Sequence, residues 1–135
     1  MNRTRQLGVG LCVLTAAIVG ASIVPIPETV PSMDPTGWIG VTTLAHIAGY
    51  GLLAAGGVVY AERSGWNPSM QSPQLGRLMM VVALVSVLGV GTELAQAAIP
   101  WRQYTLADML LNSVSALGGA LLGVGLCRLA TDPSR

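Results

Sequence analysis

Residues 78–99 read LMMVVALVSVLGVGTELAQAAI, an apolar run in which Glu93 is the only charged side chain. At about 1.5 Å per residue a helix of this length extends roughly 33 Å, enough to cross a hydrocarbon core of ~30 Å. Similar runs occur at residues 7–24, 39–61 and 106–130. The sequence therefore predicts an all-α fold, an integral membrane bundle of four transmembrane helices that forms a single domain over residues 1–135.

The composition favours the same class of protein. Hydrophobic residues make up 52% of the chain and charged residues 10%, and the mean hydropathy is +0.62. Soluble domains carry about 25% charged residues. A net charge of +1 gives no concentrated basic face for nucleic acid, so no nucleic-acid partner is expected. Cys12 and Cys127 lie within apolar runs, which predicts buried thiols and neither a disulfide framework nor a zinc site.

Loops are predicted between the runs, at residues 25–38, 62–77 and 100–105, because each contains proline and other turn formers. Arginines distinguish the two sides of the membrane. The six on one side are Arg3, Arg5, Arg63, Arg77, Arg128 and Arg135. Only Arg102 falls on the other. Since basic residues near span ends stay in the cytoplasm, we expect a multi-pass protein of the cell membrane with both termini cytoplasmic.

The first and third loops are then expected outside. The first carries Glu28 and Asp34 and no arginine, and the amphipathic rings of Trp38, Trp101 and Tyr104 fall at the outer boundary. An alternative for the first run is a signal peptide, because a basic start and an apolar stretch precede Val19-x-Ala21. The run is longer than a usual signal-peptide core, so we expect an uncleaved helix.

Several polar residues interrupt the predicted spans, namely His46, Tyr50, Glu93, Gln96, Asp108 and Asn112. A charged residue near the bilayer centre costs about 2.5–3.5 kcal/mol on insertion scales, so such residues usually face the interior of a bundle and find partners there. His46 lies roughly 10 Å from the start of its span and Glu93 roughly 9 Å from the end of its own. Asp108 lies in the first turn of the last span. All of these positions fall in the outer half of the membrane.

Helical spacing indicates that these residues share a site. Polar and small residues recur every three or four positions in the last two spans, at Ser86, Gly89, Glu93 and Gln96 and at Asp108, Asn112, Ser115 and Gly119. Gly119-x-x-x-Gly123 continues the second stripe, and small residues let helix backbones approach closely. We expect one polar cluster, open to the outer leaflet.

The ordered pattern His46-x-x-x-Tyr50, Glu93-x-x-Gln96, Arg102-x-x-Thr105-x-x-Asp108-x-x-x-Asn112, followed by Gly118, resembles that of VanZ-like membrane proteins. The resemblance covers roughly residues 40–125. It implies a polytopic membrane protein, in a family whose namesake is linked to reduced susceptibility to the glycopeptide teicoplanin, but it supplies no established reaction. The family often has Lys three residues before the histidine, where this chain has Thr43, so a headgroup contact from that lysine is not carried over.

Two interpretations remain open for the site residues. His46, Glu93 and Asp108 are candidate acid–base groups, or else His46 packs between helices and bonds to a carboxylate. These three could also share a divalent metal, but no helical ligand pair supports this, and no metal or cofactor is expected.

Arg102 either holds a lipid phosphate or pairs with Asp108. Tyr50, Gln96 and Asn112 either contact the headgroup or bridge the helices.

Three functions are therefore weighed. The preferred one is binding of a lipid headgroup or cell-envelope component, with membrane lipids as partners and effects on glycopeptide susceptibility as a consequence. The alternative is a membrane-embedded enzyme that acts on a lipid phosphate by acid–base catalysis, and the third is a small transporter. The sequence does not decide whether the protein is an enzyme, nor whether it forms a homo-oligomer.

Overall fold

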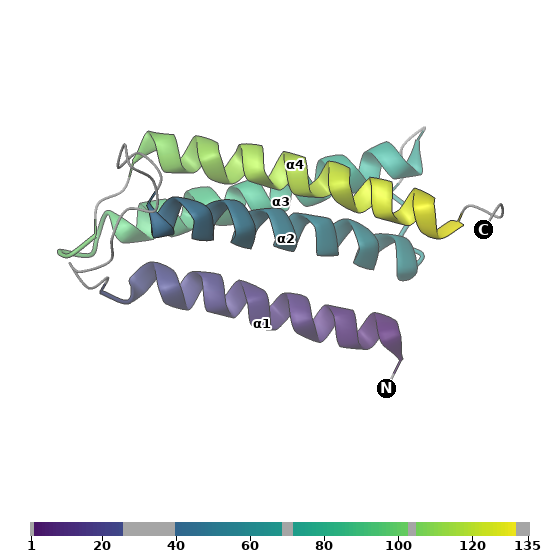
Figure 1. Cartoon of the computed structure of the whole chain (residues 1–135), viewed down its shortest axis with the longest axis horizontal. Coiled ribbons are helices and arrows are strands. Elements are labelled where there is room, and N and C mark those ends of the chain that lie inside the picture. Colours follow the sequence, from purple (N-terminus) through teal and green to yellow (C-terminus); the bar gives the residue numbers. More distant parts are fainter. Residues whose placement is uncertain (1, 26–39, 69–71, 103–104, 132–135) are drawn as a thin grey trace.

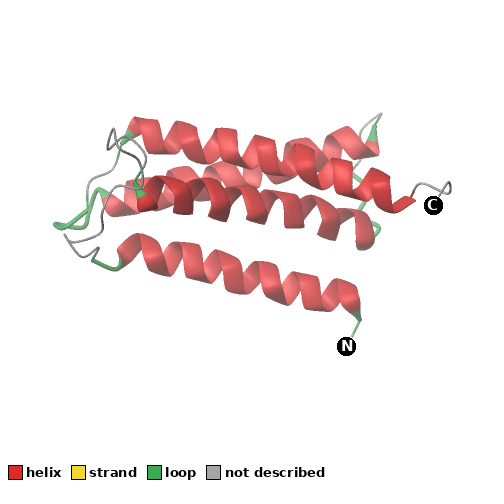
Figure 2. Cartoon of the chain, in the orientation of Figure 1, coloured by secondary structure: helices red, strands yellow, loops and turns green. Residues whose placement is uncertain are grey.

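The chain folds into four long helices arranged side by side and successively antiparallel (Figure 1). This is a computed structural model, and it describes residues 2–25, 40–68, 72–102 and 105–131. The helices are α1 (Arg3–Ile23), α2 (Val41–Arg63), α3 (Pro73–Gln96) and α4 (Leu106–Thr131). No strand occurs in the described ranges, as Figure 2 shows.

Each helix contains a stretch long and apolar enough to cross a membrane. The all-α, four-helix prediction is therefore confirmed, and the protein is a multi-pass membrane protein. The predicted residues Glu28, Asp34, Trp38, Tyr104 and Arg135 lie outside the described residues.

Two helices begin earlier than predicted, α1 at Arg3 and α3 at Pro73. Residues 62–77 were predicted as a loop because of Asn67-Pro68 and Ser72-Pro73, but α3 begins at Pro73 and includes Arg77. The Ser72 side chain accepts a hydrogen bond from the Leu75 N–H at 3.4 Å, and proline fits the first turn because its missing N–H has no intrahelical partner there. These two residues mark the start of the helix.

The two ends of the bundle differ in chemistry. At one end lie the N-terminus, the α2–α3 connection and the end of α4 (Figure 1). There Arg77 of α3 donates to Glu62 of α2. We call this the basic end, because Arg3, Arg5, Arg63 and Arg128 also belong to it. The opposite end contains the end of α1, the start of α2, the end of α3 and the start of α4, and it carries the polar residues.

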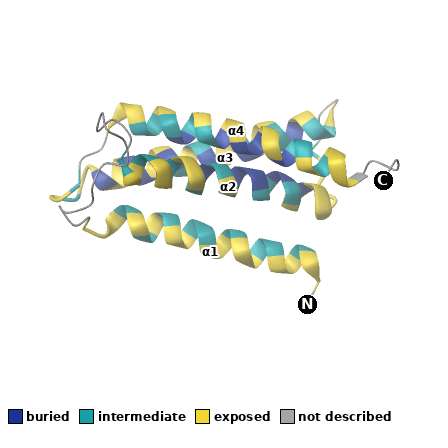
Figure 3. Cartoon of the chain, in the orientation of Figure 1, coloured by how far each residue is buried: buried dark blue, intermediate teal, exposed yellow. Residues whose placement is uncertain are grey.

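The core lies between α2, α3 and α4, and α2 contacts each of the other helices. Small residues set the spacing of α2 and α4: a side chain at Gly119 would collide with the backbone of Gly51, and one at Gly123 would come within 2.7 Å of the Ala55 carbonyl oxygen. The predicted Gly119-x-x-x-Gly123 stripe thus faces α2. Figure 3 shows buried positions on these three helices, whereas α1 has none.

Candidate functional site

Three helices bring polar side chains together near the end of the bundle opposite the basic end. The imidazole Nδ1 of His46 on α2 lies 2.8 Å from Oδ1 of Asn112 on α4 and 3.8 Å from Oε1 of Glu93 on α3. We call these residues the polar cluster. Because an amide oxygen only accepts, His46 Nδ1 carries the hydrogen in the contact with Asn112. In a neutral ring Nε2 is then the acceptor, as a general base requires.

Glu93 is the least satisfied member of the cluster. Its side chain is 0% exposed, and neither carboxylate oxygen forms a well-aligned hydrogen bond, although the Asn112 side chain and the Thr105 backbone lie close enough to stabilise the carboxylate. The 3.8 Å separation from His46 is too long for a hydrogen bond. Burial of a carboxylate without partners is unfavourable, and the nearby charge of Asp108 adds repulsion. The cluster therefore has unused hydrogen-bonding capacity in its deepest residue.

Asn112 is also fully buried, and its Nδ2 has no hydrogen-bond partner. Its position depends on Gly89 of α3, because a side chain there would come within 2.8 Å of the Asn112 Cβ. His46 differs from the other two, since its side chain is 21% exposed. It is thus the member through which the cluster reaches the surroundings.

Tyr50 belongs to a separate hydrogen-bonded chain beneath the cluster. Its hydroxyl lies 2.6 Å from Thr92 Oγ1, and Thr92 donates its single hydroxyl hydrogen to the Gly89 carbonyl at 2.8 Å. Tyr50 must therefore donate to Thr92. Its ring also contacts His46, with centroids 5.9 Å apart. These contacts make Tyr50 a residue that positions its neighbours.

Thr92 was missed by sequence reasoning. It lies between Gly89 and Gln96 in the stripe that was recognised, at helical spacing, and this spacing was the available signal.

Gln96 and Arg102 contact the end of α1. Gln96 Nε2 donates to the Ser22 carbonyl at 3.2 Å, and Arg102 Nη2 donates to the carbonyls of Ala21 and Val24. Trp101 Nε1 donates to the Ile23 carbonyl at 3.2 Å. We call these three side chains the α1 clamp. The last carbonyls of a helix lack intrahelical hydrogen-bond donors, and the α1 clamp supplies such donors.

Arg102 does not pair with Asp108, which was one of its two predicted roles. Its hydrogen bonds go to the end of α1, while its Nε is buried and has no partner. Asp108 Oδ2 accepts from the Thr105 hydroxyl at 2.7 Å, and the Asp108 N–H donates back to Thr105 Oγ1 at 3.0 Å. This pair caps α4, and the Thr-x-x-Asp spacing is a signature of such a cap.

The six predicted intramembrane polar residues and Arg102 thus fall into distinct groups. His46, Glu93 and Asn112 form the polar cluster, Tyr50 lies beneath it, Gln96 and Arg102 hold α1, and Asp108 caps α4 within electrostatic reach of Glu93. Among the described residues, no three His, Cys, Asp or Glu side chains are grouped to hold a metal ion.

Comparison of the chain with protein-family models, with curated proteins and with solved structures finds no significant match.

Proposed function

We propose that this protein is a VanZ-like membrane protein that binds the headgroup of a membrane lipid or another envelope component at the polar cluster. The observation that supports this is Glu93, a fully buried carboxylate whose two oxygens lack a well-aligned hydrogen bond and which lies beside the part-exposed His46. A ligand hydroxyl or ammonium group that donates to Glu93 would relieve its desolvation. Arg102 would add a phosphate contact through Nη1, because both of its hydrogen bonds to the end of α1 come from Nη2.

Native mass spectrometry of the protein released from nanodiscs of mixed lipids tests this proposal. The parent should retain a headgroup that Glu93→Gln retains about tenfold less, because a charge-assisted hydrogen bond is lost. Glu62→Gln is the matched control, since Glu62 lies at the basic end and pairs with Arg77. Equal retention by Glu93→Gln and the parent would remove the basis of the proposal.

Catalysis is the second candidate, favoured by the hydrogen bond that leaves His46 Nε2 as the acceptor of a neutral ring. Incubation of the purified protein with its retained lipid, followed by mass analysis of that lipid, separates an enzyme from a binder. In an enzyme, His46→Ala should abolish conversion while the lipid stays bound. A lipid that stays chemically unchanged in the parent rejects the enzyme.

A transporter has less support. The buried polar side chains of the described residues are Thr92, Glu93, Gln96 and Asn112. All lie toward one end of the bundle, whereas a transport path needs polar groups across the full depth.

The proposal also includes orientation, with the polar cluster in the outer leaflet and both termini in the cytoplasm. In a Cys12→Ala and Cys127→Ala background, Ala98→Cys should react with an impermeant thiol reagent applied to cells, and Asn67→Cys should not. Both positions are exposed and lie at opposite ends of the bundle. The reverse labelling would place the cluster in the cytoplasmic leaflet.

We include an effect on teicoplanin susceptibility in the proposal because the sequence pattern resembles that of VanZ-like proteins, and the geometry of the site adds no support for it. It is tested by the inhibitory concentration for cells expressing the parent or Glu93→Gln. A concentration unchanged by expression of the parent removes this consequence and leaves headgroup binding to be judged by mass spectrometry.

A further inference from the structure

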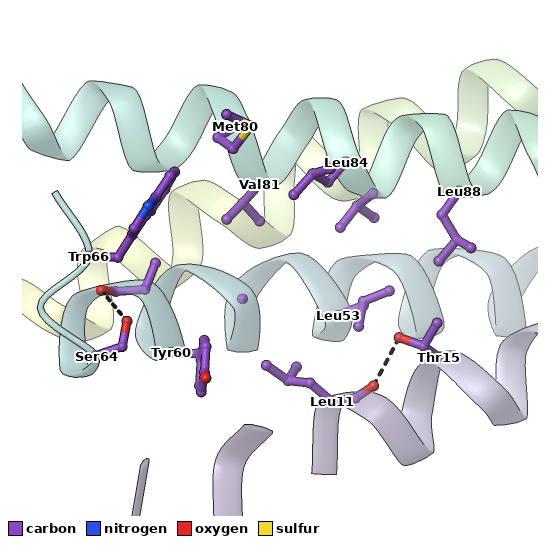
Figure 4. Close-up of a pocket in the computed structure, with 13 residues that line it drawn as sticks. Leu11, Thr15, Leu53, Tyr60, Ser64, Trp66, Met80, Val81, Leu84 and Leu88 are labelled. Carbon is purple, nitrogen blue, oxygen red and sulfur yellow. Dashed lines mark hydrogen bonds between the residues drawn. The ribbon is translucent and has the colours of Figure 1, made fainter. Parts of the chain in front are cut away.

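A second region with ligand-binding character lies on the other half of the bundle. A cavity of about 710 Å³ opens between α1, α2 and α3, as Figure 4 shows. Its wall is almost entirely apolar and includes Leu11, Leu53, Val81, Leu84, Val85 and Leu88. In a bilayer such a cavity opens to hydrocarbon chains, and an unfilled apolar cavity would forfeit dispersion contacts on its whole lining.

The length of the cavity fits one leaflet. On α2 it extends from Leu53 to Ser64, which lies just beyond the last helical residue. Eleven residues at 1.5 Å give about 16 Å, and half of a ~30 Å hydrocarbon core is about 15 Å. A single acyl chain is therefore long enough to span the cavity.

Polar groups mark one end of the cavity. Tyr60, Ser64 and Trp66 lie toward the basic end, and Figure 4 shows Ser64 and Trp66 at the same end of the cavity. The Ser64 hydroxyl bonds to the Ala61 carbonyl at 3.0 Å. Tryptophan and tyrosine prefer the headgroup level of a membrane, so this end matches the position of a lipid headgroup.

Two arginines lie at the level of that end. Between α1 and α2, Gly8 meets Tyr60, Leu11 meets Gly56 and Ile18 meets Gly49. This antiparallel register places Arg5 level with Arg63. Arg63 follows Gly49 and Gly56 at intervals of seven, so it lies on the face of α2 that meets α1.

Both arginines are exposed, and neither forms a hydrogen bond or ion pair with another described residue. Two guanidinium groups without hydrogen-bond partners among the described residues thus lie at the level of the polar end of the cavity, although neither lines it.

We propose that this cavity binds an anionic phospholipid, with one acyl chain between α1, α2 and α3 and the phosphate between Arg5 and Arg63. Arginine donors match phosphate oxygens in geometry and charge. This site lies at the opposite end from the polar cluster and does not depend on its function.

The test for the headgroup uses the full chain in vesicles of equal phosphatidylglycerol and phosphatidylcholine, followed by native mass spectrometry. The parent should retain phosphatidylglycerol preferentially. Arg5→Gln combined with Arg63→Gln should reduce that preference by about five-fold for each arginine. The control combines Arg3→Gln with Arg128→Gln, which removes the same charge from the basic end. Arg3 lies about 200° around α1 from Arg5, so it points to a different side of the helix. Arg128 belongs to α4, which does not line the cavity.

The test for the acyl chain fills the cavity. Thr15→Phe places a ring in the lining from α1, whereas Ala16→Phe places the same ring at an exposed neighbouring position. Thr15→Phe should reduce the retained phosphatidylglycerol at least five-fold, and Ala16→Phe should leave it unchanged. Circular dichroism of each variant confirms that the helices are retained.

Three results would overturn the proposal. These are equal retention of both lipids by the parent, equal loss in both arginine pairs, and equal retention by Thr15→Phe and Ala16→Phe. Recovery of a lipid-free dimer would mean that a second copy covers the cavity. The Glu93→Gln variant should keep this lipid, so failure of the headgroup site at the polar cluster is distinguishable from failure of this one.

Discussion

The α2–α4 interface and the α1–α2 interface are built on different principles. Between α2 and α4 the backbones touch at Gly119 and Gly51, where any added side chain collides with main-chain atoms. Between α1 and α2 the spacer is a side chain, such as that of Ile18, which would lie 3.4 Å from a Cβ added at Gly49. A close backbone contact gives dense packing, and without a hydrophobic driving force in lipid such packing is what holds membrane helices together.

The attachment of α1 follows from this difference. No α1 residue is buried, and a cavity lies along part of its length. Hydrogen bonds from the α1 clamp hold the last turn of α1 instead. The bundle therefore consists of a tightly packed set of three helices, α2 to α4, and a fourth helix that packs on them through part-exposed side chains and is hydrogen-bonded to them at one end.

Gly119→Leu should have the largest effect on this arrangement. The added side chain meets the Gly51 backbone, which cannot move aside as a rotamer can, so we expect a loss of about 3 kcal/mol, the upper end for overpacked cores. Unfolding in mixed detergent micelles, followed by circular dichroism, measures the change. Gly118→Leu is the control, because nothing lies within 4 Å of a Cβ at that position. Equal losses in the two variants would contradict backbone contact as the basis of the α2–α4 interface.

Arg102→Gln should have the next largest effect, and on α1 alone. Hydrogen bonds from a charged donor contribute about 1.5–3 kcal/mol each, so local opening of the end of α1 should increase by at least about tenfold. Hydrogen–deuterium exchange in detergent micelles should show faster exchange at residues 18–23 and unchanged protection at residues 51–58. Arg3→Gln, which removes an exposed arginine from the other end of α1, should change neither region. Unchanged exchange at residues 18–23 would show that α1 is held by its side-chain packing.

The sequence predicted the helices because their apolar runs are dictated by bilayer thickness, a constraint that acts on each run separately. The predicted start of α3 was wrong because the local signal there is ambiguous. Ser72-Pro73 is compatible with a turn and with the start of a helix. The polar stripes predicted that His46, Glu93 and Asn112 share one site, and they do meet.

The hydrogen-bond partners of Arg102 could not be predicted from the sequence. A guanidinium can bond to a carboxylate, a phosphate or a carbonyl, and only the position of α1 shows that the carbonyls of Ala21 and Val24 are within reach. Asp108 was different, since the Thr105-x-x-Asp108 cap could have been recognised from spacing alone. The functional roles of these residues stay predictions.

Tyr50→Phe should have the smallest effect. Its counterpart is Tyr60→Phe, because Tyr50 lies among the three packed helices whereas Tyr60 faces α1 and lines the cavity. Loss of the Tyr50 hydroxyl removes one buried hydrogen bond to Thr92, while Thr92 keeps its own donation to Gly89. We expect a loss of about 1 kcal/mol, the usual net contribution of such a bond. Tyr60→Phe, the same change at a part-exposed position, should stay within about 0.5 kcal/mol of the parent. Both are measured in the micelle unfolding assay used for Gly119→Leu. If Tyr60→Phe cost as much as Tyr50→Phe, the α1–α2 interface would contribute hydrogen bonding as strong as that of the core, and the division between three packed helices and a fourth held at its end would fail.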